Sequence, residues 1–402
     1  MKLLGIYGTG LQEKINGSVC MSDNKINVTY LIDMIGWAGA QTHLISVLNN
    51  INYDEFNVNV ICLRRAGTQF ELLEKLPVTA IVCNLENLMN PIRTIATVIR
   101  LKNFIKASNT DILQSYMFNP NLMASIISWL PGKKFKLITT RRDTGYWHQS
   151  HHWWLYKVMN VVTDKIIAVS SEVRLQSIKN EGVNPDKIIT IYNGIDVEMY
   201  NADVVDRDSS RDKFSLNDND FVIGLLAALR PEKRHDVFIR AAVQVIKKIP
   251  NAKFMIVGDG SKTVLKNIKH LLDKYGVNEQ FLLTGKLTDV ISVLKAFDVS
   301  VLCSDTEGMS NTVLQSIAMA KATIVTNVGG NPEVIENKKN GLVFHAGDSD
   351  KLAQLIINLY QDHTLKNTLE VNAAATVVDK FNIVPIIESL QNVYIDILNK
   401  NP

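Results

Sequence analysis

Short runs of valine, isoleucine and leucine recur along the whole chain, and a longer stretch with helical periodicity follows nearly every run. The runs are continuously apolar instead of alternating with polar residues, as expected for strands buried on both faces. Parallel sheets with helices on both sides have such strands, so the pattern predicts an α/β chain of doubly wound, Rossmann-like sheets. The predicted strands span residues 26–32, 58–63, 79–83, 111–116, 136–140, 165–170, 188–193, 221–227, 253–258, 281–285, 298–303, 322–326 and 341–344.

The chain has 402 residues, which is more than one hydrophobic core usually supports, so two domains are expected. The Asp- and Ser-rich stretch 196–220 lacks a sustained apolar period and is the best candidate for a linker between them. Apolar residues from Phe381 to Lys400 have the spacing of one amphipathic helix. The predicted domains are therefore 25–198 and 199–380, followed by a C-terminal helix at 381–402.

The first 24 residues do not fit either domain. Gln12, Glu13 and Lys14 interrupt any apolar core, and no cleavage-like ending follows them, so the segment is not a convincing signal peptide. We expect residues 1–24 to be a disordered leader with no role in the fold.

Composition excludes several classes of protein. Hydrophobic residues make up 46% and charged residues 21% of the chain, which argues against long disorder. The net charge of +3 is too small to indicate nucleic acid as a partner. No stretch approaches the roughly 18 apolar residues that a membrane span requires.

The four cysteines, Cys20, Cys62, Cys83 and Cys303, are far apart and form no CxxC pair. The last three lie in or beside apolar runs. We therefore expect buried free thiols in a reducing cytoplasm and no zinc site.

The segment 298–320 predicts a strand, a turn and a helix start, and ligands of open α/β sheets bind at this end of a strand. Glu307 and Gly308 lie in the turn, and Ser310 or Asn311 can cap the helix. The turn alone fits an ordinary connection equally well.

The start of this helix suits a diphosphate. Backbone N–H groups at 310–313 lack intrahelical acceptors, and the helix dipole adds positive charge. Glu307, just ahead, can accept hydrogen bonds from sugar hydroxyls, and Gln315 can reach a ribose diol. The residues predicted to bind the donor here are Gly308, Met309, Ser310, Asn311, Thr312 and Gln315, with Glu307 as a catalytic group.

A second segment, LLAALRPEKRHDVFIRA, follows the first predicted strand of the second domain. Arg230 and Lys233 fall at the end of that strand and around the next helix start, where two cations could neutralise a leaving diphosphate. A solvated helix entrance with Pro231 in its first turn is the alternative, and alone it would be the preferred interpretation.

Together and in this order, these segments resemble the retaining glycosyltransferases of family four, bacterial enzymes of polysaccharide and lipopolysaccharide synthesis among them. Such proteins have the GT-B architecture, in which two Rossmann-like domains face each other across a cleft. The resemblance runs from about Ile26 to the C-terminus. Further matching pieces are AGAQ (38–41), RRDTGYW (141–147), YNGID (192–196), VGDG (257–260), TG (284–285) and NVGGNPEVI (327–335).

The resemblance implies that the first domain binds an acceptor, that the second binds a nucleotide sugar, and that no metal or other cofactor is needed. It implies that Glu307 holds the donor sugar, Gln315 the ribose and Lys233 the diphosphate. It also implies that the last helix crosses back to the first domain. The glycines that it places beside the donor are Gly39, Gly258 and Gly285.

The turn that contains Gly258 and Gly260 has an alternative of its own. Thr263 leaves the dinucleotide-binding fingerprint incomplete, so NAD is not expected. A close approach to a nucleotide and a plain tight turn both remain open.

Three positions depart from the family pattern. Gln315 replaces the second of two glutamates eight positions apart, which keeps hydrogen bonding to ribose but loses a charge. Ala228 replaces an arginine, for which Arg230 could substitute because alternate residues of a strand share a face. Arg142 replaces a histidine and cannot accept a proton near neutral pH, but it can clamp a phosphate or carboxylate.

Aromatic and basic residues concentrate in the first domain. His148 and His152 could share a helix face and bind a metal, but an aromatic acceptor wall is the preferred interpretation and no metal site is predicted. Trp129 precedes Lys133 and Lys134, a mixture that suits docking at an anionic membrane surface. Core aromatics beside a solvated lysine loop fit equally well.

The sequence thus predicts an enzyme that moves a hexose from a nucleoside diphosphate, UDP being favoured, to a hydroxyl of a glycan or lipid-linked acceptor with retention. It would act in cell-surface polysaccharide synthesis in the cytoplasm, at the inner face of the plasma membrane if the Trp129 region docks there. Because of the departures at Gln315, Ala228 and Arg142, a non-catalytic sugar-nucleotide-binding protein of the same pathway is the alternative. An epimerase or phosphorylase ranks last, because no suitable carboxylate pair or pyridoxal phosphate lysine motif is present.

Overall fold

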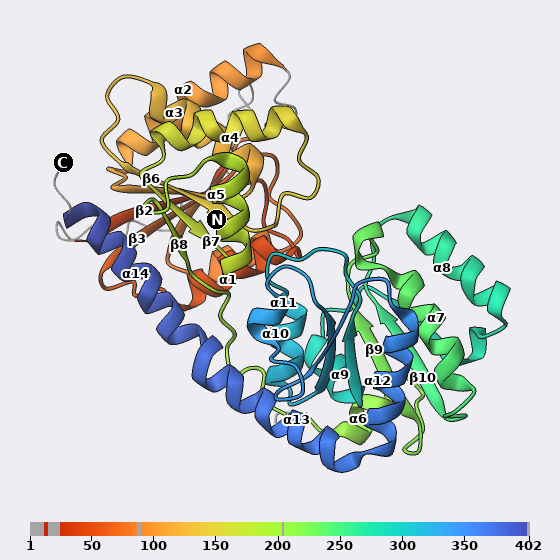
Figure 1. Ribbon diagram of the computed structural model, residues 1–402. Coiled ribbons are helices and arrows are strands. Elements are labelled where there is room, and N and C mark those ends of the chain that lie inside the picture. The colour runs from red at the N-terminus through yellow and green to blue at the C-terminus, as the bar shows by residue number, and fades with distance from the viewer. Residues whose placement is uncertain (1–11, 15–24, 87–89, 203–204, 400–402) are drawn as a thin grey trace. The chain divides into compact units, whose positions relative to one another are not determined.

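The computed structural model describes residues 12–14, 25–86, 90–202 and 205–399. The chain divides into two compact units, which we describe one at a time (Figure 1). Unit 1 contains the residues up to Tyr192 together with those from Val384 onward, and unit 2 is Asn193–Ile383. The first division falls six residues before the one drawn from the sequence.

Unit 1 is built on a sheet whose described strands run in the order β1-β4-β3-β2-β5-β6-β7-β8. All neighbours are parallel except β1 and β4. The strand order reverses beside β2, as in a doubly wound sheet. The strands are β1 (Gln12–Lys14), β2 (Ile26–Ile32), β3 (Phe56–Cys62), β4 (Val78–Val82), β5 (Ile112–Ser115), β6 (Lys136–Arg141), β7 (Lys165–Ala168) and β8 (Ile188–Thr190).

The edge strand β1 differs from the expectation that the leader takes no part in the fold. Glu13 pairs with Ile81 in an antiparallel register. The exposed edge of a sheet offers unpaired N–H and C=O groups to any extended segment, so joining it requires no apolar pattern. The rest of the leader, 1–11 and 15–24, lies outside the described residues.

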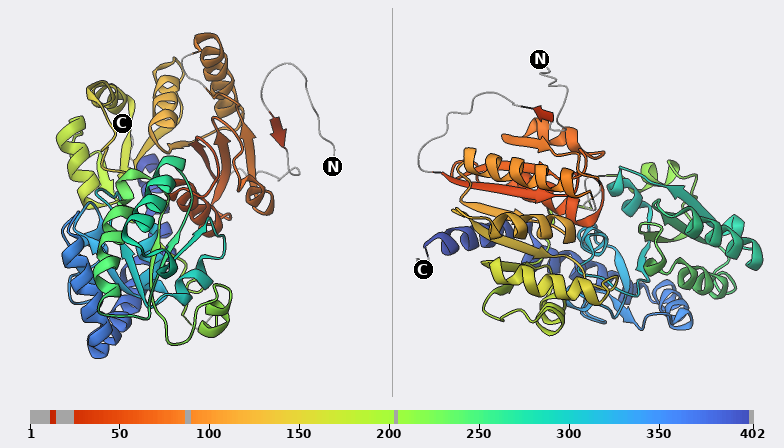
Figure 2. Two further views of the ribbon diagram at one scale, coloured as in Figure 1. Left: turned by 90° about the vertical axis from the view of Figure 1, so that its right-hand side faces the viewer. Right: turned by 90° about the horizontal axis from the view of Figure 1, so that it is seen from above.

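Helices cover both faces of this sheet (Figure 2). Strand side chains alternate between faces, so Leu31 joins a core with Leu101 and Met123, whereas Tyr30 points to the opposite side and meets Tyr394. The first face carries α2 (Pro91–Ala107), α3 (Phe118–Trp129), α4 (Ser150–Val162) and α5 (Ser171–Glu181), and the second carries α1 (Gly39–Asn50) and α14 (Ile383–Asn399).

The C-terminal helix α14 packs on unit 1 through its buried Tyr394. The Tyr394 hydroxyl lies 3.0 Å from that of Tyr30 and donates to Gln114 Oε1 at 2.6 Å. The edge of its ring meets Phe56. The amphipathic pattern of 381–402 therefore corresponds to a helix that belongs to unit 1 along most of its length.

Unit 2 has a parallel sheet in the order β11-β10-β9-β12-β13-β14. All of the strands predicted between 26 and 344 are present in the two units. The strands of unit 2 are β9 (Phe221–Leu226), β10 (Ala252–Val257), β11 (Phe281–Gly285), β12 (Val299–Leu302), β13 (Ala322–Thr326) and β14 (Leu342–Phe344). Its helices are α6 (Arg207–Asp212), α7 (His235–Ile246), α8 (Lys262–Tyr275), α9 (Val290–Ala296), α10 (Asn311–Ala318), α11 (Asn331–Val334), α12 (Ser349–Gln361) and α13 (His363–Thr376).

The order in which the chain adds strands to this sheet reverses between β9 and β12. Ligands of such sheets bind where the order switches, outside the carboxyl ends of the strands. The loops that leave β9 and β12 there are 227–234 and 303–310, the two segments that the sequence singled out.

The stretch 196–220 is not the linker that its composition indicated. It contains α6, whose Arg211 is fully buried and bonds Asp298 at 2.6 Å. The same guanidinium donates to main-chain carbonyls, including that of Asp220 at 3.0 Å. The stretch therefore folds around a buried cation through its main-chain carbonyls and the carboxylate of Asp298.

Cys62, Cys83 and Cys303 are buried free thiols, as predicted, whereas Cys20 lies outside the described residues. Within the described residues, no group of three or more His, Cys, Asp or Glu side chains is placed to hold a metal ion. In that same part of the chain, no helix is both long enough and apolar enough to cross a bilayer.

Candidate active site

The turn after β12 leads directly into α10, as predicted. Ser310 caps this helix, because its hydroxyl accepts a hydrogen bond from Val313 N at 3.4 Å. The helix ends at Ala318, two residues earlier than expected. The cap therefore uses one of the four amides, those of residues 310–313, that the sequence assigned to a diphosphate.

Glu307 and Lys233 come together although they are 74 positions apart. Lys233 Nζ lies 2.5 Å from Glu307 Oε1, and Ser304 Oγ donates to the same oxygen at 2.6 Å. The Glu307 side chain is only 9% exposed and that of Lys233 18%. The two groups predicted for sugar and diphosphate therefore form one ion pair.

The main chain beneath Glu307 rests on a second loop. Gly330 N donates to Gly308 O at 3.1 Å. Gly329 has φ +52°, and a Cβ there would lie 1.6 Å from the carbonyl oxygen of Glu307. The sequence singled out NVGGNPEVI as a matching piece but not as the support of Glu307, because a sequence does not show which backbones touch.

The loop after β9 holds Lys233 in a 3₁₀ turn, η2 (Pro231–Lys233). Ala228 and Arg230 are exposed while Leu229 between them is buried, so the two share a face, as expected. The Arg230 side chain is 57% exposed and lies 3.9 Å from Glu232, and Arg230 does not take part in the Lys233–Glu307 pair.

Arg234 was not predicted as a site residue. It adopts a left-handed conformation with φ +48° and lies 2.9 Å from both Asp236 and Asp305. Hydrogen bonding to Asp236 is the main cause that raises the pKa of Arg234 above its ordinary value. This pairing ties the loop after β9 to the turn that precedes Glu307.

The predicted ribose ligand, Gln315, donates to the hydroxyl of Tyr200 at 2.8 Å. Asn193 donates to Asn311 Oδ1 at 2.7 Å, and its own N–H meets the Met309 sulfur at 3.2 Å. These contacts explain why unit 2 begins at Asn193. Neither Tyr200 nor Asn193 was predicted, although YNGID was among the matching pieces.

The three predicted glycines occupy different places. Gly258 and Gly285 follow adjacent strands, and Gly258 N donates to Gly285 O at 2.9 Å. Gly39 is the first residue of α1 in unit 1.

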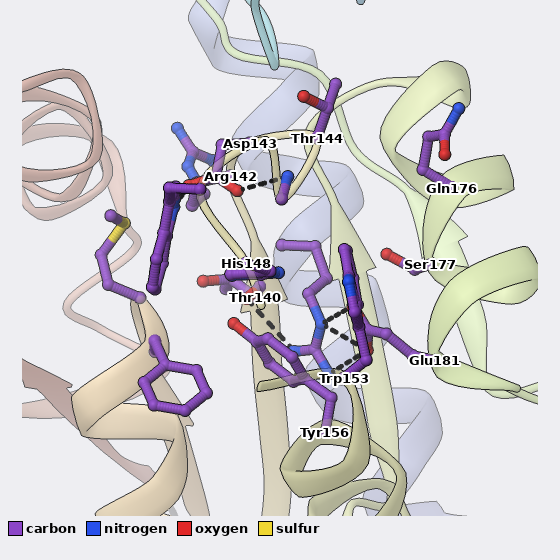
Figure 3. A pocket seen from close by; sticks show the side chains of 15 residues that line it. Thr140, Arg142, Asp143, Thr144, His148, Trp153, Tyr156, Gln176, Ser177 and Glu181 are labelled. Carbon is purple, nitrogen blue, oxygen red and sulfur yellow. Dashed lines mark hydrogen bonds and ion pairs between the residues drawn. The ribbon is translucent and has the colours of Figure 1, made fainter. Parts of the chain in front are cut away.

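Arg142 lies in a pocket of unit 1 just beyond β6 (Figure 3). It is half-buried, and burial lowers its pKa to about 10, so the guanidinium stays charged at neutral pH. In Figure 3 Arg142 and Asp143 lie toward one end of the pocket and Tyr156 toward the other. The lining also includes the aromatic rings of Phe118, Trp147, His148 and Trp153, and polar side chains such as Gln176 and Ser177.

Beneath this pocket, Arg141 forms a buried ion pair that the sequence did not reveal. Its Nη2 lies 2.8 Å from Glu181, and its guanidinium stacks on the Tyr156 ring at 4.2 Å. Arg141 is therefore neutralised by Glu181, and both Arg141 and Arg142 line the pocket.

His148 and His152 are brought together, with ring centroids 5.6 Å apart. Aromatic rings surround His148, with Trp153 at 4.5 Å and Tyr156 at 5.1 Å. Burial is the main cause that lowers the pKa of His148, so the ring is neutral at pH 7. The predicted aromatic wall thus exists, with a charged Arg142 beside it.

Comparisons with known proteins agree with this arrangement. The model described as "Glycosyltransferase Family 4" matches residues 37–199, and the model "Glycosyl transferases group 1" matches 206–376. The chain is 26% identical over 390 residues to an Escherichia coli protein named UDP-Gal:alpha-D-GlcNAc-diphosphoundecaprenol alpha-1,3-galactosyltransferase, and the match covers 94% of this chain and 99% of that one. It is 25% identical over 306 residues to the N-acetyl-alpha-D-glucosaminyl L-malate synthase of Bacillus anthracis, with 74% and 78% covered.

Solved structures give the same fold. A glycosyltransferase from Rickettsia africae superposes with a TM-score of 0.83 at 21% identity, covering 94% of this chain and 100% of that one. The Anabaena protein HepE, solved with UDP and glucose, has a TM-score of 0.81 at 20% identity, with 91% and 98% covered. The two matched family models together span most of both units, and the chain therefore belongs to the family-four glycosyltransferases and has their GT-B fold.

Proposed function

We propose that this glycosyltransferase transfers a hexose from a UDP-sugar to a hydroxyl of a lipid-linked glycan, with retention at the anomeric carbon and without a metal. The observation that carries the proposal is the pairing of Glu307 with Lys233 and Ser304 at the amino end of α10. A helix start and a cation bind a diphosphate, and a carboxylate accepts hydrogen bonds from the hydroxyls of the sugar.

UDP is supported by two relatives. HepE was solved with UDP and with UDP-glucose, and the name of the Escherichia coli relative contains UDP-Gal. In this chain the diphosphate would lie at the α10 amides, with Lys233 and the exposed Arg230 as cations. Gln315 would reach the ribose through the amide that now bonds Tyr200.

The chemistry follows from where charge develops. As the glycosidic bond breaks, the leaving diphosphate gains negative charge, which Lys233 and the helix start stabilise more strongly in the transition state than in the ground state. Glu307 accepts hydrogen bonds from hydroxyls of the departing sugar. Attack from the same face, with the leaving phosphate taking the acceptor proton, gives retention and needs no covalent nucleophile on the protein.

The acceptor would be held by unit 1. The Escherichia coli relative is named for an acceptor with a sugar, a diphosphate and a polyprenyl chain. Arg142 can clamp a phosphate, and the aromatic wall around His148 offers faces on which a sugar ring can stack. Such an acceptor would place the enzyme in cell-surface polysaccharide synthesis, at the inner face of the plasma membrane.

Glu307→Gln tests the proposal. The substitution keeps the size of the side chain but removes the charge that pairs with Lys233, so transfer should fall at least ~100-fold, as for loss of a strong transition-state interaction. The assay is sugar transfer from UDP-galactose, UDP-glucose and UDP-N-acetylglucosamine to N-acetylglucosaminyl-diphosphoundecaprenol. Near-normal turnover by Glu307→Gln would refute the role of Glu307.

Glu336→Gln is the matched control, because Glu336 is 61% exposed and pairs only with Lys339 at the surface. It should keep wild-type turnover. NMR of the anomeric proton of the first product reports retention or inversion, and EDTA should leave the rate unchanged. A wild-type protein that binds UDP-sugars but transfers none with any acceptor would instead support the non-catalytic alternative.

A further inference from the structure

Three neighbouring helices of unit 1 expose apolar stripes on their outward sides. On α2 the stripe is Ile92, Ile95 and Ile99, which are 80%, 60% and 53% exposed. Their spacing of three and four residues places them on one side of the helix. The opposite side of α2, with Val98, Leu101 and Ile105, is buried in the core. The three exposed isoleucines therefore do not contribute to that core.

The next two helices repeat the pattern. On α3, Trp129 is 56% exposed and Ile126 36%. On α4, Trp154 is 62% exposed and Val161 64%, with Val158 between them at 36%. Each stripe follows helical spacing, and each lies on the solvent side of a helix whose other side packs on the sheet.

The stripes are neighbours in space. α2 packs on α3, and α3 packs on α4, and both views of Figure 2 show α2 and α3 side by side on one face of the unit 1 sheet. Lys102 of α2 donates to Pro131 O, just past the end of α3, at 2.7 Å. Packed helices are about 10 Å apart, so the stripes form one apolar face roughly 20 Å across, which we call the α2–α4 face.

The charges of this face have one sign. The helices α2, α3 and α4 contain no Asp or Glu. Lys133, in the turn after α3, pairs with Asp164. The other basic residues on these helices and that turn are Arg93, Arg100, Lys102, Lys106, Lys134 and Lys157.

We infer that the α2–α4 face docks on an anionic phospholipid bilayer. Exposed isoleucine, valine and tryptophan interleaved with lysine and arginine bind at the boundary of acyl chains and headgroups, and each added cation strengthens attraction to anionic lipid. Unit 2 offers nothing comparable, since its large exposed apolar residues in the described chain are Met199, Val371 and Val378, with no aromatic residue among them. A protein partner would need a surface that is both acidic and apolar, whereas an anionic bilayer provides negative headgroups and apolar acyl chains over its whole surface.

The α2–α4 face includes helices whose amino ends line the Arg142 pocket. Phe118 begins α3, and Trp153 and Tyr156 lie in the first turns of α4, and all three line the Arg142 pocket. The pocket is therefore at the amino ends of the helices that would lie on the lipid. A lipid-linked acceptor would meet the pocket without leaving the membrane, a consequence that rests on the proposed function, although docking itself does not.

The test is sedimentation of the full chain with vesicles, one set of phosphatidylcholine alone and one of phosphatidylcholine and phosphatidylglycerol in equal parts. The wild type should bind the anionic vesicles, more weakly at high salt, and shift its tryptophan emission to the blue. The double substitution Ile95→Glu with Ile99→Glu should weaken binding at least about tenfold, because it removes apolar area and adds negative charge.

The matched control is Val371→Glu with Val378→Glu, which makes the same change in charge at residues 69% and 61% exposed on unit 2. It should bind vesicles like the wild type. Equal weakening by both pairs, or no vesicle binding by the wild type, would overturn the inference. So would a dimer in sedimentation velocity that only the Ile95 and Ile99 substitutions abolish, because the face would then belong to a second copy.

UDP affinity, measured by calorimetry on the same proteins, separates this inference from the proposed function. All variants should bind UDP equally, and two wild-type unfolding transitions in scanning calorimetry should show that both units are folded in each variant. A wild type that binds UDP but no vesicles contradicts only the docking face, whereas a wild type that binds vesicles but not UDP contradicts only the donor site.

Discussion

At Glu307, one oxygen of the carboxylate receives both donors that the structure places on it. Lys233 Nζ lies 2.5 Å and Ser304 Oγ 2.6 Å from Oε1. The other oxygen is then the one that a sugar hydroxyl can approach. Fixing a carboxylate by two donors preorganises it, so the site need not reorganise when charge develops in the transition state.

Gly329 makes the position of Glu307 testable without touching its side chain. A Cβ at residue 329 would lie 1.6 Å from the Glu307 carbonyl oxygen, so Gly329→Ala must displace that turn. We expect transfer to fall about 100-fold, since a shift of about 1 Å in a catalytic group has this effect. Steady-state kinetics and thermal unfolding measure the two consequences.

Gly276→Ala is the control for backbone strain. Gly276, at the end of α8, has φ +67°, and a Cβ added there would meet nothing within 4 Å. Both substitutions carry the left-handed cost of about 1–2 kcal/mol, but only Gly329→Ala adds a collision. Equal kinetics for the two variants would show that Gly329 does not hold Glu307 in place.

His235, two residues after Lys233, predicts a pH dependence of stability. It is 3% exposed, and burial, helped by the charge of Lys233, lowers its pKa to about 4. The unfolded chain has a histidine pKa of about 6.5 and therefore binds more protons between about pH 4 and 6.5. The contribution is complete above about pH 6.5 and is lost as the pH falls through this window, by up to roughly 3 kcal/mol.

Urea unfolding at pH 7 and at pH 4.5 measures this loss. His235→Leu, which cannot titrate, should lose less free energy of unfolding between the two values than the wild type does. His270→Leu is the control, because His270 is exposed on α8, and it should keep the wild-type difference. If the His235 and His270 variants behave alike, His235 is not the titrating group.

At the scale of elements, α14 is held on unit 1 by a chain of buried hydroxyls. Tyr394→Phe removes the donor that Gln114 Oε1 receives at 2.6 Å and the contact with Tyr30 at 3.0 Å. A buried acceptor without a donor costs about 1–3 kcal/mol, so chemical denaturation should show a loss of that size. Tyr360→Phe, which keeps the ring contact with Phe221, should change stability by no more than about 0.5 kcal/mol.

The helices α2, α3 and α4 each have a side that packs in the core and a side that exposes apolar residues. Their inward sides complete the core through residues such as Leu101 and Met123. Their outward sides carry apolar stripes that burial in the fold does not explain. An amphipathic pattern in the sequence reveals the first side readily, but exposure of the second is known only once the packing is known.

For the whole molecule, two units with separate cores predict two unfolding transitions. The residues of the proposed UDP site that pair with one another, Glu307 and Lys233, lie within unit 2. A ligand stabilises the state that binds it, so UDP should raise the midpoint of one transition in scanning calorimetry and leave the other unchanged. An equal rise in both would show that the units unfold as one, and no rise at all would count against the donor site.

Much of the architecture was predictable because it depends on local pattern. The continuous apolar runs corresponded to the thirteen strands β2 to β14, since burial on both faces leaves an unmistakable composition. The segments with Glu307 and Lys233 were also predictable, because each follows a strand at the sheet edge where ligands bind.

Other features depended on partners far away in the chain. Arg141 and Arg142 are adjacent residues of the same type, and adjacent residues of a strand point to opposite sides. The sequence does not show which of the two sides provides an acidic partner. Only the tertiary structure showed that Arg141 is paired with Glu181, 40 positions on, although both arginines line the pocket. The stretch 196–220 was mistaken for a linker because its local pattern does not show that Arg211 is buried against Asp298, 87 positions on.

The sequence by itself therefore determined the two parallel sheets and the chemistry available at the ends of β9 and β12. Strand burial and helix starts depend on the types of neighbouring residues, which the sequence shows directly. The tertiary structure decided which charges are neutralised, which glycine supports Glu307, and which apolar residues remain outside. Those outcomes depend on contacts between residues distant in the chain, and no local pattern specifies them.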